Sequence, residues 1–167
     1  DPYLSRGLGD VYKRQPVPNK TVLDDHFITM AEALKTSGYV SASMGKWHLG
    51  ADPTTQGFDD NIAGKEWGSP SGGGYHSPYR YPNLVQKEKG EYLTDRLTAE
   101  ATKFIEAQQE KPFFLYLTHY AVHTPIQGRA DLVEKYKGKS KGEHHKNAAY
   151  AAICLLYTSP SPRDRYG

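Results

Sequence analysis

A continuous apolar run, Phe113-Phe114-Leu115-Tyr116-Leu117, is the feature that most constrains how this chain can fold. Strands with one solvated face alternate apolar and polar residues, whereas a short unbroken apolar run is typical of a strand covered on both faces. Such strands belong to parallel sheets that are flanked by helices. The run therefore predicts a buried parallel strand over 113–117, and with it a layered α/β domain.

Helical and extended patterns alternate along the rest of the chain, which supports the same fold class. Asp24 and Asp25 are expected to cap the first helix at its amino end, and Gly38 is expected to end it. The expected elements, in chain order, are helix 25–37, strand 39–44, helix 94–109, strand 113–117 and helix 129–136. We predict an incomplete α/β layered sheet with helices on both faces.

The two ends of the chain are related as opposite strands of one DNA sequence. Codons can be chosen for residues 1–15 such that the complementary strand, read one base out of phase, encodes every residue of 154–167. The shared part resembles a transposon-type sequencing adaptor, so we expect both segments to be adaptor-derived and exclude them from fold reasoning. Residues 16–153 then have the length of one modest domain, or of a piece of a larger one.

The positive charge of the chain lies in those terminal segments. The net charge is +2, of which residues 1–15 and 154–167 carry one each, so residues 16–153 are neutral and contain no cysteine. The basic balance therefore does not indicate nucleic acid or a membrane as a partner, and we expect neither. Cys154 indicates neither a redox compartment nor a nucleophile. No apolar run approaches the roughly 18 residues of a membrane span, and no signal peptide is recognised.

Basic side chains follow two of the predicted strands. The first strand leads into Lys46-Trp47-His48, and the second leads into His119 and then His123. Residues two apart in an extended segment point the same way, so Lys46 and His48 are expected to face one cleft while Trp47 anchors the backbone. Ligands of open α/β sheets bind outside the carboxyl ends of the strands. The ammonium of Lys46 and the imidazoles of His48 and His123 therefore predict a site that binds a compact anion and transfers a proton. For any one histidine alone, a structural role stays open.

Residues 64–91 show no sustained period and are rich in Gly, Ser, Pro and Tyr. A long irregular stretch within a domain is usually functional or disordered. The aromatic residues favour an ordered loop that faces a ligand over a flexible linker.

Three stretches of this sequence resemble the sulfatase family of the alkaline-phosphatase-like superfamily. They are residues 29–50, which end in GKWHLG, residues 57–64 (GFDDNIAG), and residues 91–127, which contain PFFLYL and His123-Thr124-Pro125. The likeness covers residues 22–152 and is strongest to bacterial arylsulfatases and polysaccharide sulfatases. It implies that residues 16–153 are part of the amino-terminal catalytic domain of an enzyme that hydrolyses sulfate esters, those of a sulfated carbohydrate in particular.

The resemblance also implies roles for the basic residues. Lys46 would contact the nucleophile and a sulfate oxygen. His48 would act as base on the second hydroxyl of the nucleophile when sulfate is eliminated. His123 would bind sulfate and assist departure of the alcohol. His119 lies near the same strand end and is expected to line the pocket, with no chemical role assigned to it. Within this reading the loop over 64–91 selects the sugar, with packing as the alternative role for some of its candidate contacts: Trp67, Tyr75, His76, Tyr79 and Arg80.

The family's nucleophile and metal ligands are not expected within this chain. The nucleophile is a formylglycine made in a Cys/Ser-x-Pro/Ala-x-Arg motif, which the sequence lacks, and it works beside a bound calcium. Asp24-Asp25 precede a helix and Asp59-Asp60 lie in a stretch the family uses structurally, so neither pair is assigned to calcium. His144-His145 have no third ligand in a Lys/Gly-rich loop, so we predict no metal site here. The fragment is therefore expected to be catalytically inactive and marginally folded.

Two other readings stay open at this point. A phosphodiesterase or phosphonate hydrolase of the same superfamily would need a different nucleophile and a second metal. A carbohydrate-binding module would use the aromatic stretch 67–81 without needing the basic residues. The family resemblance alone implies a periplasmic or secreted location for the full-length protein.

Overall fold

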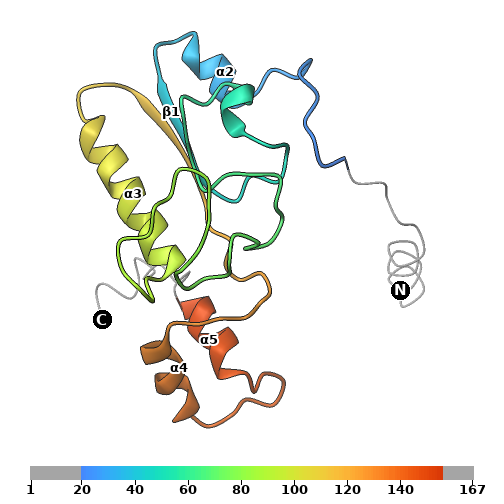
Figure 1. The fold of residues 1–167 in the computed structure, drawn as a ribbon, viewed down its shortest axis with the longest axis vertical. Coiled ribbons are helices and arrows are strands. Elements are labelled where there is room, and N and C mark those ends of the chain that lie inside the picture. The colour runs from blue at the N-terminus through green and yellow to red at the C-terminus, as the bar shows by residue number, and fades with distance from the viewer. Residues whose placement is uncertain (1–19, 156–167) are drawn as a thin grey trace, which may run out of the picture.

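Three parallel strands form the sheet at the centre of the chain in the computed structural model, which describes residues 20–155 (Figure 1). The strands are β1 (Val40–Gly45), β2 (Asp60–Ile62) and β3 (Phe113–Thr118). β1 lies in the middle, where Met44 is opposite Ile62 on one side and Leu117 on the other. The parallel sheet predicted from the apolar run is confirmed. The predicted adaptor segments lie outside the described residues, apart from Cys154 and Leu155.

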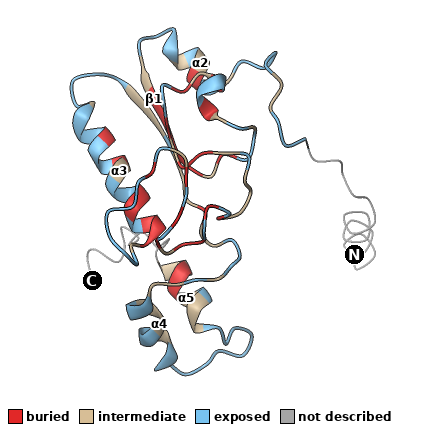
Figure 2. Ribbon diagram, viewed as in Figure 1, coloured by how far each residue is buried: buried red, intermediate tan, exposed pale blue. Residues whose placement is uncertain are grey.

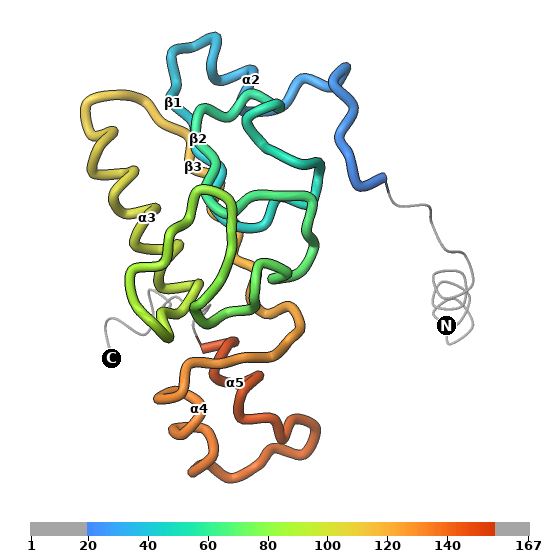
Figure 3. The backbone as a smooth tube through the Cα atoms, viewed as in Figure 1, coloured from blue at the N-terminus to red at the C-terminus, as the bar shows by residue number. Residues whose placement is uncertain are grey.

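Helices lie on both faces of this sheet, as predicted. They are α2 (Met30–Lys35), α3 (Leu93–Ala107), α4 (Ala130–Lys137) and α5 (Ala148–Leu155), and a 3-10 turn, η1 (Pro53–Gln56), precedes β2. α3 runs along one face, while α4 and α5 pack on each other beyond the carboxyl end of β3 (Figures 1 and 3). The loops that follow β1 and β3 therefore begin at the carboxyl end of the sheet.

Side chains alternate between the two faces along each strand, as strand geometry requires. On one face Ala42 and Met44 pack against Ala101 and Phe104 of α3. On the other face Ala31 of α2 joins a cluster of buried aromatic residues, Trp47 and Phe58, against which Phe114 packs. The buried residues accordingly run along the sheet and the inner side of α3 (Figure 2).

The burial of β3 on both faces was predicted and is wrong for the described residues. Its side chains are only half-buried, and Tyr116 is 37% exposed. The physical reason is that β3 is an edge strand, and on its second face Phe114 and Tyr116 line an open apolar groove beside α2, a helix of 6 residues.

The first helix begins later than predicted. Thr29 caps it, because its Oγ1 accepts from the Glu32 N–H at 3.1 Å while the Glu32 carboxylate accepts from the Thr29 N–H at 2.7 Å. Such a capping box satisfies two backbone donors at once. Asp24 instead pairs with Lys20 at 2.9 Å, and Asp25 accepts from the Gln56 amide at 2.9 Å, so neither caps the helix.

Candidate functional site

The carboxyl ends of β1 and β3 are joined at one point. The Lys46 N–H donates to the Thr118 carbonyl at 2.7 Å, and the Thr118 hydroxyl donates to the Lys46 carbonyl at 2.6 Å. Gly45 makes this approach possible, since a Cβ there would lie 1.9 Å from the Thr118 carbonyl oxygen and its φ is +108°. The Lys46 side chain is half-buried, and no carboxylate in residues 20–155 pairs with its ammonium. This edge of the sheet therefore presents a cation that is free to meet an anion.

Trp47 and His48 continue from that point. Trp47 is buried against Phe58, with ring centroids 5.8 Å apart, so it anchors the segment as predicted. His48 is exposed, and its N–H donates to the Lys65 carbonyl at 2.9 Å. Its φ of +64° differs from the extended geometry assumed in the sequence argument. A histidine in the left-handed region is uncommon, and such residues cluster at functional sites.

His123 lies on the turn after β3 and is exposed. Its N–H donates to the Tyr120 carbonyl at 3.0 Å, and its carbonyl accepts from the Tyr75 hydroxyl at 2.9 Å. Nδ1 lies 2.8 Å from the Thr124 carbonyl oxygen, a contact that requires a proton on Nδ1. That assignment leaves Nε2 as the nitrogen available to a substrate.

His119 directly follows β3 and is half-buried. Burial lowers the pKa of its imidazole from the usual value, and nearby Asp95 opposes this only in part. A neutral imidazole suits a residue that lines a pocket without carrying charge.

Two residues of the predicted sugar-facing set are core residues in this structure. Tyr75 has no exposed surface, and Tyr79 is 5% exposed. The Tyr79 hydroxyl donates to Glu91 at 2.6 Å, and burial, together with that hydrogen bond, raises the pKa of Tyr79. His76 is half-buried beside Tyr92, with Nε2 3.3 Å from the Gly128 carbonyl oxygen. The buried rings of Tyr75 and Tyr79 hold the loop together and leave no face for a sugar.

The other two residues of that set line an open hollow. Trp67 and Arg80 face it together with four small residues, and its volume is about 530 Å³. Arg80 is exposed, and its guanidinium has no carboxylate partner among residues 20–155. The small residues of the wall are Ser71, Gly72, Gly73 and Pro78. We call this space the Trp67–Arg80 hollow.

The sequence reasoning missed the residues that order the loop. Gln127 accepts the Tyr75 N–H on its side chain at 2.9 Å and the Tyr92 hydroxyl on its carbonyl at 3.0 Å. Gly68 lies against the His48 imidazole. These contacts join segments far apart in the chain, so no local pattern could have revealed them.

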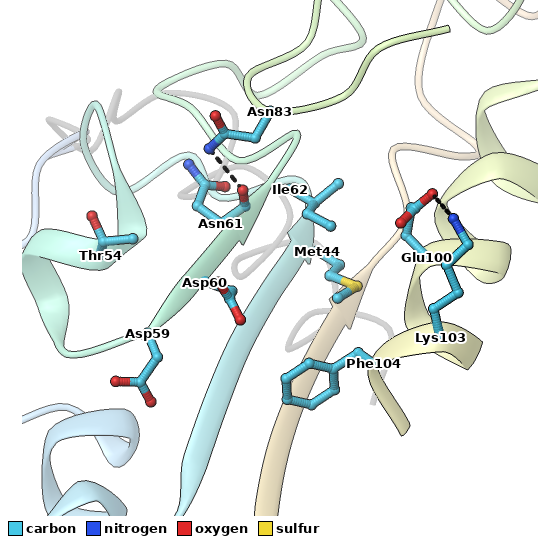
Figure 4. Close-up of a pocket in the computed structure, with 10 residues that line it drawn as sticks. All are labelled: Met44, Thr54, Asp59, Asp60, Asn61, Ile62, Asn83, Glu100, Lys103 and Phe104. Carbon is cyan, nitrogen blue, oxygen red and sulfur yellow. Dashed lines mark hydrogen bonds and ion pairs between the residues drawn. The ribbon is translucent and has the colours of Figure 1, made fainter. Parts of the chain in front are cut away.

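A second hollow, of about 460 Å³, lies between β2 and α3 and contains acidic residues (Figure 4). Two of them, Asp59 and Glu100, have structural partners there. Asp59 accepts from Lys35 at 2.7 Å and from the Ser41 N–H at 2.9 Å, and these bonds lower the pKa of its carboxyl group. Glu100 pairs with Arg96 and Lys103, each at 2.8 Å. Within residues 20–155 no three or more His, Cys, Asp or Glu side chains form a group that could hold a metal ion.

Comparisons with known proteins identify the family of this chain. The Sulfatase family model matches residues 4–167. Arylsulfatase J of Mus musculus is 31% identical over 154 residues, which are 80% of this chain and 25% of that protein. An arylsulfatase of Klebsiella aerogenes is 30% identical over 132 residues, 70% of this chain and 28% of that protein.

Solved structures show the same fold. Ps i-CgsB superposes with a TM-score of 0.59 at 23% identity and covers 83% of this chain and 35% of its own. A protein from work on glycosaminoglycan metabolism in Bacteroides thetaiotaomicron gives a TM-score of 0.61 at 15% identity, covering 85% and 40%. The chain thus spans about a quarter of the curated relatives it matches. By its sequence and its α/β fold, this chain belongs to the sulfatase family.

Proposed function

We propose that this chain is part of a sulfuric ester hydrolase that cleaves sulfate esters of a carbohydrate, with Lys46, His48 and His123 at its site. The observation that carries the proposal is the joined end of β1 and β3, where the Lys46 backbone is held by Thr118 and its ammonium has no carboxylate partner in residues 20–155. An uncompensated cation at a rigid strand end is suited to a tetrahedral oxyanion.

Each residue then has a task in sulfate transfer. Lys46 holds a sulfate oxygen. As an imidazolium, with a proton on each ring nitrogen, His123 donates the Nε2 proton to the alcohol oxygen as the sulfur–oxygen bond breaks, while its Nδ1–H stays bonded to the Thr124 carbonyl. His48 takes a proton from the nucleophile when sulfate leaves. His119 lines the pocket as a neutral imidazole.

The formylglycine and calcium of the family belong, in this proposal, to parts of the protein beyond this chain. The acidic residues near the sheet do not fit a calcium cage, because Asp59 is engaged by Lys35 and Ser41 and no three or more His, Cys, Asp or Glu side chains of residues 20–155 form a group that could hold a metal ion. When bound, calcium would stabilise the negative charge of the sulfate.

The Trp67–Arg80 hollow is the surface that we propose for the sugar. The half-buried ring of Trp67 can stack on a sugar ring, and the guanidinium of Arg80 can donate two parallel hydrogen bonds to an acidic group of a saccharide. The names of two similar proteins mention a saccharide. One is an N-acetylgalactosamine-6-sulfatase of Canis lupus familiaris, which is 35% identical over 131 residues (62% of this chain, 24% of that protein). The other is the Ps i-CgsB complex with k-i-k-neocarrahexaose.

Single alanine substitutions in the full-length protein test the proposed site. Lys46→Ala, His48→Ala and His123→Ala are each expected to lower kcat/KM for an aryl sulfate by roughly 10²–10⁴-fold, the usual contribution of a proton-transfer or charge-binding group. His145→Ala, in an exposed loop, is the matched control and should leave the rate unchanged. Three variants with wild-type rates would refute the site. Hydrolysis of a phosphodiester or phosphonate in place of a sulfate ester would favour the superfamily relative. Sugar binding without any turnover would favour a binding module.

The chain by itself is expected to be inactive. It supplies cationic and histidine side chains but not the family's nucleophile motif, so no ester cleavage should occur above a buffer blank with an aryl sulfate. Detectable turnover by residues 16–153 would contradict this.

The full-length protein is proposed to act outside the cytoplasm, in the periplasm or after secretion. No helix within residues 20–155 is long and apolar enough to cross a membrane.

A further inference from the structure

We propose that Gly68 is a positioning residue for the His48 imidazole, so that the loop facing the sugar also sets the geometry of the proposed base. The catalytic role of His48 rests on the proposed function. The contact between the two residues stands on geometry alone.

The imidazole lies directly on the bare Cα of Gly68. A Cβ built there would be 2.5 Å from Cε1, 2.8 Å from Nε2 and 2.9 Å from Nδ1 of His48, closer than real Cβ atoms approach. Gly68 does not have a left-handed φ, so its backbone would accept alanine without strain. A Cβ at this position would therefore displace the imidazole, which is the flexible end of an exposed side chain, while the backbone could stay in place.

The same stretch of loop also holds the His48 backbone. The His48 N–H donates to the Lys65 carbonyl at 2.9 Å, and its φ is +64°. The main chain and the ring of His48 thus both contact residues 65–68, while the side chain remains exposed. Pre-organisation of this kind keeps a proton-accepting nitrogen where it is needed.

Trp67 lies between these two contacts and lines the Trp67–Arg80 hollow. A sugar seated against Trp67 and an imidazole seated on Gly68 would share one short backbone segment. We infer that the two neighbours have separate roles: Trp67 contributes to substrate affinity, and Gly68 positions the imidazole of His48.

Kinetics of the full-length protein separate these roles. Gly68→Ala is expected to lower kcat ten- to hundredfold on both an aryl sulfate and a sulfated saccharide, with little change in KM and a shifted pH profile of kcat, since the base is displaced. Trp67→Ala is expected to raise KM for the saccharide alone. Gly138→Ala is the matched control, because its Cβ would meet nothing closer than 3.9 Å and its φ is −76°. An unchanged kcat in Gly68→Ala would overturn the proposal.

A stability cycle tests the contact without any activity. Gly68→Ala should lower the urea midpoint when His48 is present and should not lower it in the His48→Ala background, where the added methyl group finds room. If Gly68→Ala folds only in the His48→Ala background, the contact is supported. An equal loss in both backgrounds, or failure to fold in both, refutes it. If the wild-type protein shows no sulfatase activity, the proposed function is refuted, but this cycle still tests the contact between Gly68 and His48.

Discussion

His48 adopts a backbone conformation, φ +64°, that costs most L-residues free energy. Glycine adopts it without that cost. In the full-length protein, His48→Gly is therefore expected to raise the free energy of unfolding by up to about 1 kcal/mol while abolishing activity. Denaturant unfolding beside an aryl sulfate assay would measure both effects.

His145→Gly is the control for that substitution. His145 is exposed and its φ is not in the left-handed region, so glycine there should cost about 0.5–1 kcal/mol through backbone entropy. A His48→Gly variant that is destabilised as much as His145→Gly would show that the conformation of His48 is not strained.

The Asp59 carboxylate gives stability that depends on pH. Hydrogen bonds from Lys35 and from Ser41 lower its pKa below the usual 3.8. The stabilisation is therefore present above pH 3.8 and is lost as the pH falls through the lower, folded-state pKa. Asp59→Asn is expected to cost about 1–2 kcal/mol at pH 7 and less at pH 3.

Urea unfolding at the two pH values would measure the difference. Asp60→Asn is the control, since Asp60 is exposed and has no hydrogen-bond or ion-pair partner within the described part of the chain. The same cost for Asp59→Asn at pH 7 and pH 3 would contradict the assignment.

At the scale of elements, the start of α2 offers a test between two caps. The sequence suggested Asp24 and Asp25, whereas the structure shows a capping box at Thr29, whose hydroxyl also donates to the Gln56 carbonyl at 2.8 Å. Thr29→Ala is expected to lower the free energy of unfolding by about 1 kcal/mol. Asp24→Ala, which removes only an exposed pair with Lys20, should cost less than about 0.5 kcal/mol. Equal costs in thermal unfolding would argue against the Thr29 cap.

The elements that sequence reasoning predicted are those with long periodic or apolar patterns. β1, α3, β3 and α4 begin and end within two residues of the expected positions. β2 was missed because its 3 residues, Asp-Asn-Ile, carry no period and form a strand only by pairing with β1. α5 was missed because its run is apolar on all sides and ends inside the excluded terminal segment.

The candidate site divides in the same way. Lys46, His48 and His123 follow strand ends that could be predicted, so their place at the edge of the sheet was accessible from sequence. The burial of Tyr75 and Tyr79 was not, because composition cannot separate a tyrosine that packs from one that faces a ligand. The contact between His48 and Gly68 could not be predicted either, because it forms between two segments that meet only in the folded chain.

At the scale of the whole molecule, the second face of the sheet is only partly covered. An apolar groove of about 410 Å³ runs between α2 and the sheet, and exposed side chains line it. Among them Ile28 is 82% exposed and Met30 66%. β2 and β3 also each leave one edge unpaired within residues 20–155. Contiguous apolar surface and open strand edges both promote association.

We therefore expect the isolated chain to be marginally folded and to self-associate at micromolar concentration, mainly through the groove. Ile28→Lys should shift it towards monomer in sedimentation velocity, because a buried ammonium without a partner opposes contact. Val85→Lys is the matched control, since Val85 is 80% exposed but lies outside the groove. Association that resists Ile28→Lys would point to the strand edges instead. A monomer with a cooperative thermal transition would show that three strands and their helices suffice as a folding unit.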